Sequence, residues 1–168
     1  MFENNVLVNL MNSHLLKILF VCTGNICRSP TAEVVLNKLA RQQGLVHRLQ
    51  FDSAGTHAYH VGEAPDKRSQ KYAASRQYDL SGKRARQVNA TDYVKFDYLL
   101  AMDQENLSVL RERCPSEYQH KLALFLEFTL ALKNQSVPDP YYGEARDFEL
   151  VLDLCEQAGH VLLQNLAE

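Results

Sequence analysis

A short apolar run that passes straight into a loop and then into a helix constrains the fold of this chain more than any other feature. Residues Leu15–Val21 are nearly all apolar, which is typical of a strand buried on both faces of a sheet. Turn-forming residues follow at Thr23-Gly24-Asn25, and Ser29-Pro30 then indicates a helix with its serine as the cap. The helical pattern continues until Gly44 ends it. The sequence therefore predicts a strand, a loop and a helix in direct succession.

The rest of the chain alternates in the same way. The pattern predicts three further strands, at Leu49–Ala54, Asp97–Met102 and Lys121–Leu126. For the last of them, the start of a buried helix is a second interpretation. Three further helices are expected, at Asp66–Tyr78 with its first residue as the cap, at Asp103–Cys114, and at Arg146–Leu166. This alternation predicts an α/β fold, in which helices cover both faces of a parallel sheet.

The composition fits a single domain with one local binding site. A chain of 168 residues with 46% hydrophobic and 23% charged residues can bury one sizeable core. Its formal net charge of −2 gives no overall positive field. This argues against nucleic acid or an anionic membrane as the main partner, and any site for an anion must be local.

The cysteines and the N-terminus indicate a cytoplasmic compartment. Four cysteines, at positions 22, 27, 114 and 155, are too few and too scattered for a disulfide framework. Glu3 near the start and Lys17 beside the apolar run do not support a signal peptide or a membrane-spanning segment. We expect residues 1–14 to be an N-terminal extension and residues 15–168 to be the domain. Met11 is a second candidate for the start of the chain, besides Met1.

The loop at residues 22–30 has the composition of a phosphate-binding site. Backbone N–H groups of a loop that enters a helix point toward one spot, and the helix dipole adds positive charge there. Gly24 and Asn25 tolerate the left-handed backbone angles that a loop folded around an oxyanion needs. No Gly-Lys-Ser/Thr sequence closes the loop, which excludes a nucleotide-binding loop of the Walker type.

Cys22 and Arg28 are candidates for a nucleophile and a phosphate-binding group in this loop. The N–H groups and Arg28 would stabilise a thiolate at Cys22, which would make it a nucleophile. Arg28 offers a planar fork for two phosphate oxygens, and Ser29 can donate a hydrogen bond to the sulfur. A Cys-x5-Arg pattern by itself is also compatible with Cys22 as a small buried apolar residue. The strand before the loop and the helix after it favour the catalytic interpretation.

The run VCTGNICRSP at residues 21–30, together with Asp139-Pro140-Tyr141-Tyr142, resembles the low-molecular-weight protein tyrosine phosphatases. Four further matches extend the resemblance along the chain: SAGT at 53–56, PDKR at 65–68, ARQV at 85–88 and FDYLLAMD at 96–103. The resemblance implies a four-stranded parallel sheet with strand order 2-1-3-4. It also implies hydrolysis of protein phosphotyrosine and small aryl phosphates through a cysteinyl-phosphate intermediate.

The resemblance assigns roles to individual residues. It makes Cys22 the nucleophile, Arg28 the phosphate clamp and Ser29 the thiolate stabiliser. Asp139 becomes the general acid, which protonates the leaving oxygen and then activates the water that hydrolyses the intermediate. The residues expected to touch phosphate or substrate are Thr23, Gly24, Asn25, Ile26, Cys27, Ser29, Tyr59, Tyr141 and Tyr142.

Two positions leave questions for the structure. Asn25 and Ser53 match a hydrogen-bonded pair that supports the loop, but Lys83 stands where many members of the family have a histidine behind that pair. A lysine has no acceptor, so this support is either weakened or rebuilt. Cys27 has two open roles, as a small buried residue or as a thiol that captures an oxidised Cys22 in a disulfide.

No cofactor and no metal are expected. The six histidines lack the spacing of a metal site, and they stand at positions 14, 47, 57, 60, 120 and 160. The expected partners are a tyrosine-phosphorylated protein and inorganic phosphate, the latter as product and competitive inhibitor.

Charge is distributed unevenly along the chain. Between Lys67 and Arg86 there are seven basic residues and one acid, Asp79. From Asp139 onward there are seven acids and one base, Arg146. The basic run is either a solvated helix face or a guide for acidic phosphoprotein segments.

Two rival functions share parts of this pattern. An arsenate reductase of the same fold relies on additional redox cysteines, and residues 79–89, where they would be expected, contain none. A non-catalytic phosphotyrosine-binding module would be expected to lack Cys22, Arg28 or Asp139, and all three are present.

Overall fold

Four parallel strands form the centre of the protein, whose computed structural model describes residues 14–168. The strands are β1 (Leu16–Cys22), β2 (Leu49–Gly55), β3 (Tyr98–Ala101) and β4 (Leu122–Leu124). Their order in the sheet is β2-β1-β3-β4, and each neighbouring pair is parallel. The predicted fold class and strand order are thereby confirmed. The predicted extension at residues 1–14 lies outside the described residues, apart from its last residue.

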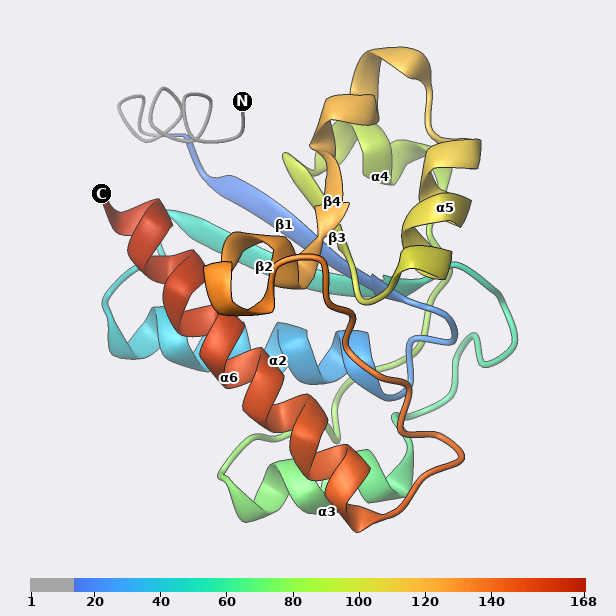
Figure 1. Cartoon of the computed structure of the whole chain (residues 1–168), viewed down its shortest axis with the longest axis vertical. Coiled ribbons are helices and arrows are strands. Elements are labelled where there is room, and N and C mark those ends of the chain that lie inside the picture. The colour runs from blue at the N-terminus through green and yellow to red at the C-terminus, as the bar shows by residue number, and fades with distance from the viewer. Residues whose placement is uncertain (1–13) are drawn as a thin grey trace.

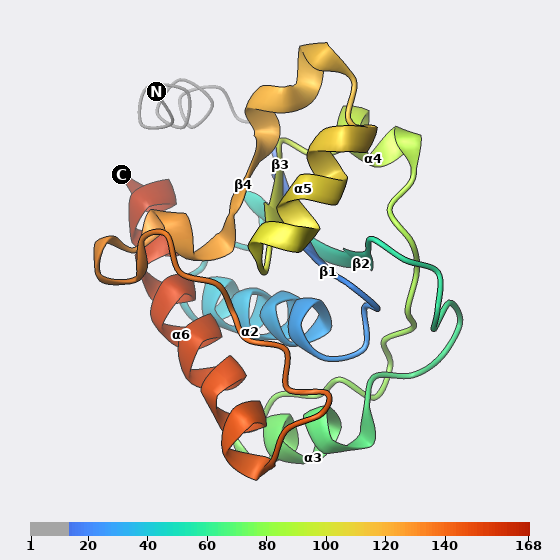
Figure 2. The same ribbon diagram turned by 45° about the vertical axis from the view of Figure 1, so that its right-hand side comes forward.

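Helices cover both faces of this sheet (Figure 1). On one face lie α2 (Arg28–Gln42) and α6 (Ala145–Ala167), and α3 (Lys67–Ser75) packs beside the first part of α6. Figure 2 shows α4 (Ala90–Lys95) and α5 (Gln104–Arg113) on the opposite side of the sheet. The chain therefore forms three layers, with β1 in the interior of the middle one.

Each face of the sheet has its own apolar core. On the side of α2 and α6, the ring of Phe20 lies 5.8 Å from that of Phe51 and 5.0 Å from that of Phe125. On the other side, Leu19 and Val21 belong to a separate buried cluster. Neighbouring side chains of a strand point to opposite faces, so a strand between two cores is apolar at nearly every position, and in β1 the half-buried Lys17 near its start is the exception. This explains why the first apolar run shows no alternation.

The start of α2 differs from the prediction in its cap. The helix begins at Arg28, and Cys27 occupies the cap position without a side-chain hydrogen bond. The prediction that Ser29 caps this helix is therefore wrong. Its hydroxyl contacts the sulfur of Cys22 and the carbonyl oxygen of Ala54 instead. Ser29 therefore lies in the first turn of α2, and its hydroxyl makes hydrogen bonds to Cys22 and Ala54 rather than to the helix N-terminus.

Helix α3 has the predicted cap but is shorter than predicted. The side chain of Asp66 accepts a hydrogen bond from the N–H of Arg68, as expected of a cap. The helix ends at Ser75 rather than at Tyr78. Gln77 has a φ of +65°, a left-handed conformation that ends a helix.

Residues 121–126 contain both of the predicted alternatives. The strand β4 is followed directly by a 3-10 helix, η2 (Phe125–Phe128). Two further 3-10 segments, η1 (Ser116–Lys121) and η3 (Leu130–Leu132), and the short helix α4 were not predicted. Elements of three to six residues are too short for their apolar periodicity to be recognised in a sequence.

The two charged runs of the sequence meet where α3 ends beside α6. Arg76 forms ion pairs with three carboxylates of α6, those of Glu149, of Asp153 at 2.8 Å and of Glu156 at 3.3 Å. The hydroxyl of Tyr78 donates to Glu156 over 2.9 Å. Opposite charges that are segregated along the sequence thus hold two helices together.

The loop after β1 lies where ligands bind in open α/β sheets. Cys22 is the last residue of β1. The next two strands along the chain, β2 and β3, pair with opposite edges of β1. Such a reversal of strand order leaves a crevice at the carboxyl ends of the strands. Among residues 14–168, no helix is long and apolar enough to cross a membrane.

Candidate active site

A cleft of about 250 Å³ opens at the carboxyl edge of β1. It is lined by Cys22, Thr23, Gly24, Ile26, Cys27, Arg28, Tyr59, His60, Asp139, Tyr141 and Tyr142. All of these except His60 were predicted as site residues. Three other predicted residues, Asn25, Ser29 and Ser53, are buried and do not line the cleft. Segments from three distant parts of the chain therefore meet at one place.

Hydrogen-bond donors surround the sulfur of Cys22. The N–H of Asn25 donates to it over 3.3 Å, and the hydroxyl oxygen of Ser29 lies 3.0 Å away. The side-chain amide of Asn25 donates to that same hydroxyl oxygen over 2.8 Å. The proton of the hydroxyl is thus available to the sulfur or to the carbonyl oxygen of Ala54, 3.3 Å away. Donors placed in this way stabilise negative charge on a buried sulfur.

Hydrogen bonds to one nitrogen of its guanidinium group, Nη1, hold the side chain of Arg28 in place. Nη1 donates to the carboxylate of Asp103 over 2.5 Å and to the carbonyl oxygen of Val137 over 3.1 Å. Nη2 has longer contacts of 3.5 Å, to the hydroxyl of Thr23 and to the carboxylate of Asp139. The group is therefore fixed from behind, while its Nη2 edge faces groups that line the cleft.

The charge of Arg28 is stabilised although its side chain is only 2% exposed. Burial disfavours the charged form, but the sulfur of Cys22 and the carboxylates of Asp103 and Asp139 outweigh it, so the pKa of Arg28 lies above its ordinary value. Asp103 was not predicted as a site residue. The signal was its position two residues after the end of β3, because the carboxyl ends of neighbouring parallel strands lie at the same edge of a sheet.

Asn25 holds the loop in a strained backbone conformation. Its φ is +57°, in the left-handed region that few residues adopt. Its side-chain nitrogen donates to the hydroxyls of Ser29 and Ser53, and its side-chain oxygen accepts from the N–H of Arg86 over 2.9 Å. Each polar atom of this side chain therefore fixes the turn.

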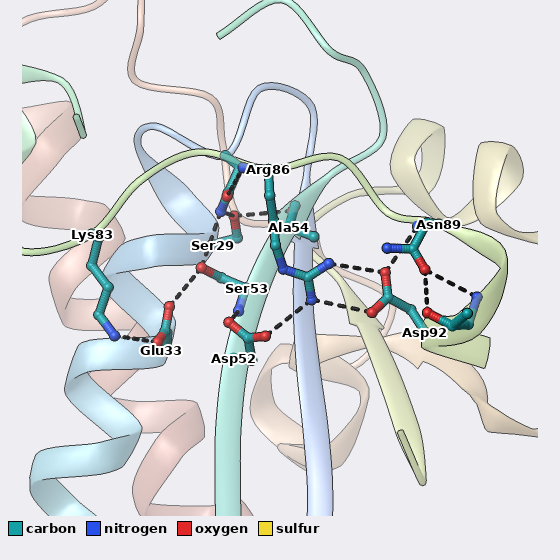
Figure 3. A network of polar contacts seen from close by, with 11 residues as sticks. Ser29, Glu33, Asp52, Ser53, Ala54, Lys83, Arg86, Asn89 and Asp92 are labelled. Atoms are coloured by element: carbon teal, nitrogen blue, oxygen red, sulfur yellow. Dashed lines mark hydrogen bonds and ion pairs between the residues drawn. The ribbon is translucent and has the colours of Figure 1, made fainter. Parts of the chain in front are cut away.

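Lys83 supports this turn through a glutamate (Figure 3). Its ammonium group forms an ion pair with Glu33, whose other carboxylate oxygen accepts a hydrogen bond from Ser53 over 2.7 Å. Ser53 in turn accepts from Asn25 over 3.0 Å. Glu33 is only 5% exposed, and Lys83 is the cation paired with its buried carboxylate. The support that the sequence left in question is rebuilt in this chain as an ion pair.

A second set of charges holds Arg86 beside the same loop (Figure 3). Its guanidinium group binds Asp52 and Asp92, each over 3.0 Å. Its backbone N–H donates to Asn25, and its carbonyl oxygen accepts from the N–H of Gly55 over 2.8 Å. A Cβ atom at Gly55 would lie 2.7 Å from a carbonyl oxygen of the loop, so only glycine fits there.

Asp139 and two tyrosines reach the cleft from the segment before α6. One carboxylate oxygen of Asp139 lies 3.5 Å from Arg28, and the other accepts from the N–H of Tyr141 over 3.1 Å. The side chain of Asp139 is 50% exposed, so water and a ligand can reach it. The rings of Tyr141 and Tyr142 meet edge to face, 4.9 Å apart. Tyr59 lines the cleft from the segment after β2.

His60 also lines the cleft, although the sequence analysis did not single it out as a site residue. Its Nδ1 lies 2.8 Å from the carboxylate of Glu63. A Cβ atom at Gly24 would lie 2.9 Å from its ring, so this histidine packs directly on the loop. Its position next to Tyr59 in the sequence was the available signal.

Cys27 lines the cleft but is only 5% exposed, and it packs among Ile26, Ala85 and Phe148. Burial raises the pKa of its thiol to about 12, so Cys27 is protonated at neutral pH. Both Cys22 and Cys27 are free cysteines.

Ion pairs account for most of the basic run between residues 67 and 86. Four of its seven basic side chains bind carboxylates, namely Arg68, Arg76, Lys83 and Arg86. The charges of these four side chains are paired within the fold. Within residues 14–168, no cluster of three or more His, Cys, Asp or Glu side chains could hold a metal ion.

Comparisons with known proteins agree with one another. A model of the family described as low molecular weight phosphotyrosine protein phosphatase matches residues 17–168. A protein of Synechocystis sp. that is named as a low molecular weight protein-tyrosine-phosphatase is 44% identical over 154 residues, which are 91% of this chain and 98% of that relative. The human low molecular weight phosphotyrosine protein phosphatase is 37% identical over 88% of this chain and 94% of its own length.

A solved structure resembles this fold closely. The crystal structure of a protein tyrosine phosphatase from Entamoeba histolytica, with Hepes in the active site, has a TM-score of 0.86 and 41% sequence identity. The match covers 90% of this chain and 97% of that one.

The ion pair behind the loop predicts a double-mutant effect. Lys83→Met leaves the buried carboxylate of Glu33 without its cation, so we expect the free energy of unfolding to fall by about 1–3 kcal/mol. Lys83→Met combined with Glu33→Gln removes the charge and keeps an acceptor for Ser53, so most of the loss should be recovered. The measurement is urea denaturation, with the exposed Lys67→Met as the control. Additive losses in the double variant would show that the two side chains act independently.

Proposed function

We propose a two-step mechanism for this chain, which belongs to the low molecular weight phosphotyrosine protein phosphatase family and is a protein tyrosine phosphatase. The observation that carries the mechanism is that a nucleophile, a clamp and an acid line one cleft. Cys22 lies among hydrogen-bond donors, and Nη2 of Arg28 lies 3.5 Å from the carboxylate of Asp139.

In the first step the sulfur of Cys22 attacks the phosphorus of a tyrosyl phosphate. An S–P bond forms while the P–O bond to the phenol breaks, and Asp139 gives its proton to the departing phenolic oxygen. The remaining phosphate oxygens bind the N–H groups of residues 23–28 and the guanidinium group of Arg28. Negative charge on these oxygens is stabilised by donors that are already in position, so little reorganisation is needed.

In the second step water hydrolyses the cysteinyl-phosphate. Asp139, now a carboxylate, takes a proton from a water molecule whose oxygen attacks phosphorus, and the S–P bond breaks. Cys22 leaves as a thiolate that the N–H of Asn25 and the hydroxyl of Ser29 stabilise. Inorganic phosphate is released, and because it can bind the same donors it acts as a competitive inhibitor. Both steps use protein groups and water alone.

The aromatic residues of the cleft favour a tyrosine-phosphorylated protein as substrate. Tyr59, Tyr141 and Tyr142 line the same cleft as Cys22. A phosphorylated tyrosine is long enough to reach the sulfur between these rings, and its own ring packs against them. Phosphoserine is too short for both contacts.

We also propose a cellular compartment for the enzyme and the boundaries of its catalytic domain. Its free cysteines suit the reducing conditions of the cytoplasm. The catalytic domain comprises residues 15–168, and residues 1–14 are an N-terminal extension.

The proposed reaction is tested by assaying phosphotyrosine hydrolysis, phosphoserine hydrolysis and arsenate reduction, with and without a thiol reductant. We expect efficient hydrolysis of phosphotyrosine alone. Cys22→Ser should retain less than about one part in a thousand of this activity, because a serine hydroxyl ionises too poorly to attack phosphorus. The variant should still bind inorganic phosphate through its loop. Substantial turnover by Cys22→Ser, or reduction of arsenate, would contradict the proposal.

The role of Asp139 predicts a dependence on the leaving group. Asp139→Asn keeps the shape of the side chain but cannot transfer the proton. We expect kcat/KM for phosphotyrosine to fall by about a hundredfold or more. For esters of acidic nitrophenols, which depart without a proton, the loss should be less than about tenfold. The measurement is kcat/KM across a series of aryl phosphates. The same loss for every ester would mean that Asp139 only positions the substrate.

Cys27 is proposed to protect Cys22 from irreversible oxidation. Peroxide converts the thiolate of Cys22 to a sulfenic acid, and the thiol of Cys27 then forms the S–S bond while water leaves. Because burial raises the pKa of Cys27 to about 12, its thiolate fraction grows about tenfold per pH unit in the neutral range. Disulfide formation should therefore be faster at pH 8 than at pH 6.

The test of this role is the recovery of activity. Cys27→Ser should keep most of its activity, yet regain less than about half of the wild-type recovery when a thiol reductant follows peroxide. Mass spectrometry of the oxidised wild type should show a peptide that links Cys22 to Cys27. Equal recovery, with no linked peptide, would leave Cys27 as a packing residue.

A further inference from the structure

The segment that carries the proposed general acid has little structure of its own. No helix or strand lies between η3 and α6. Val137 anchors its beginning, since it is buried and its N–H donates to the carbonyl oxygen of Met102 over 2.7 Å. Beyond this anchor Asp139 and Tyr142 are exposed, whereas Pro140 is buried and Tyr141 is half-buried. The distance between Asp139 and the sulfur of Cys22 therefore depends on contacts made by a few residues of this segment.

Arg68 makes such a contact from the first turn of α3. Its Nη2 donates to the carbonyl oxygen of Tyr141 over 2.9 Å, two residues beyond Asp139. Its guanidinium group also lies over two rings of the same region, 4.7 Å from the centre of Phe148 and 5.6 Å from that of Tyr141. Figures 1 and 2 both place the start of α3 beside the segment that precedes α6.

Asp66 fixes this guanidinium group and joins it to the phosphate loop. Its two carboxylate oxygens accept from Nε of Arg68 over 3.0 Å and from Nη2 over 2.8 Å, which is a bidentate pair. The backbone N–H of Asp66 donates to the carbonyl oxygen of Ile26 over 2.9 Å. The chain of contacts thus runs from the loop of Cys22 to the segment of Asp139.

We propose that Arg68 is a positioning residue for the general acid and that, with Asp66, it fixes the segment of Asp139 against the loop of Cys22. This inference rests on the proposed role of Asp139. A general acid must lie within hydrogen-bond reach of the leaving oxygen, and a displacement of about 1 Å can lower a rate a hundredfold. Arg68 does not line the cleft, so it acts through the carbonyl oxygen of Tyr141.

Geometry, rather than stability, is what this pair contributes. The side chain of Arg68 is 43% exposed, and ion pairs with an exposed partner contribute little to the free energy of unfolding. A planar fork can bind one carboxylate with two nitrogens while it donates to a carbonyl oxygen and stacks on a ring. A lysine ammonium cannot reproduce that arrangement. The PDKR sequence at 65–68 is part of the family resemblance, but it predicted no role for Arg68, and it predicted Asp66 only as the cap of α3.

The inference is tested by the leaving-group dependence of kcat/KM in Arg68→Lys and Asp66→Asn. Arg68→Lys keeps the charge and removes the fork, whereas Asp66→Asn keeps the cap and the bond to Ile26 but weakens the pair. Both should lower kcat/KM for phosphotyrosine about tenfold and that for an acidic nitrophenyl phosphate less than about twofold. Lys71→Met, on the same helix, is the control and should match the wild type for every ester.

The outcomes separate this inference from the mechanism on which it rests. If Asp139→Asn shows the selective loss and the two variants lose activity equally for all esters, or lose none, Arg68 has no role in positioning the acid. If Asp139→Asn loses the same fraction of kcat/KM for every ester, the proposed role of Asp139 as general acid is contradicted, and the inference about Arg68 loses its basis. Urea denaturation of each variant identifies a loss that comes from unfolding, and Asp66→Asn provides the result if Arg68→Lys folds poorly.

Discussion

Asn25 uses every polar atom of its side chain to hold a backbone turn that few residues adopt. A left-handed conformation at a residue other than glycine costs about 1–2 kcal/mol. Three hydrogen bonds, two to the buried Ser29 and Ser53 and one to the half-buried Arg86, offset this cost, since each contributes about 1 kcal/mol. The turn directs the N–H of Asn25 at the sulfur of Cys22, and the hydroxyl of Ser29, which Asn25 also holds, lies beside that sulfur. The placement of hydrogen-bond donors around the sulfur of Cys22 therefore depends on this one residue.

The partners of Asn25 are fixed in turn by charges that surround β2. On one side Lys83 and Glu33 hold Ser53, and on the other Asp52 and Asp92 hold Arg86 (Figure 3). Ser53 and its neighbour Asp52 are consecutive residues of one strand, so their side chains point to opposite faces. A single strand thus carries both supports of the loop. With lysine at position 83, this chain holds Ser53 through the buried carboxylate of Glu33.

Charge in this protein is segregated along the sequence and paired in space. Most of the basic run binds carboxylates within the fold, and Arg76 alone joins α3 to three acids of α6. What remains at the cleft is one buried cation, Arg28, facing the groups that line the cleft. A net negative chain can therefore present a local site for phosphate, because the position of one guanidinium group matters there more than the total charge.

The sequence by itself determined the strand, the loop and the helix around Cys22, and the strand order came with the family resemblance. These features are local, since apolar runs, turn residues and Cys-x5-Arg spacing act over a few neighbouring positions. The tertiary structure alone decided that Ser29 contacts a sulfur instead of capping a helix, that Lys83 acts through Glu33, and that Asp103 holds Arg28. In each case a polar group could form hydrogen bonds or ion pairs with several partners, and the partner it has depends on which segments the sheet brings together. Arg28 and Asp103 are 75 positions apart, so a pattern of neighbouring residues cannot predict the hydrogen bond between their side chains.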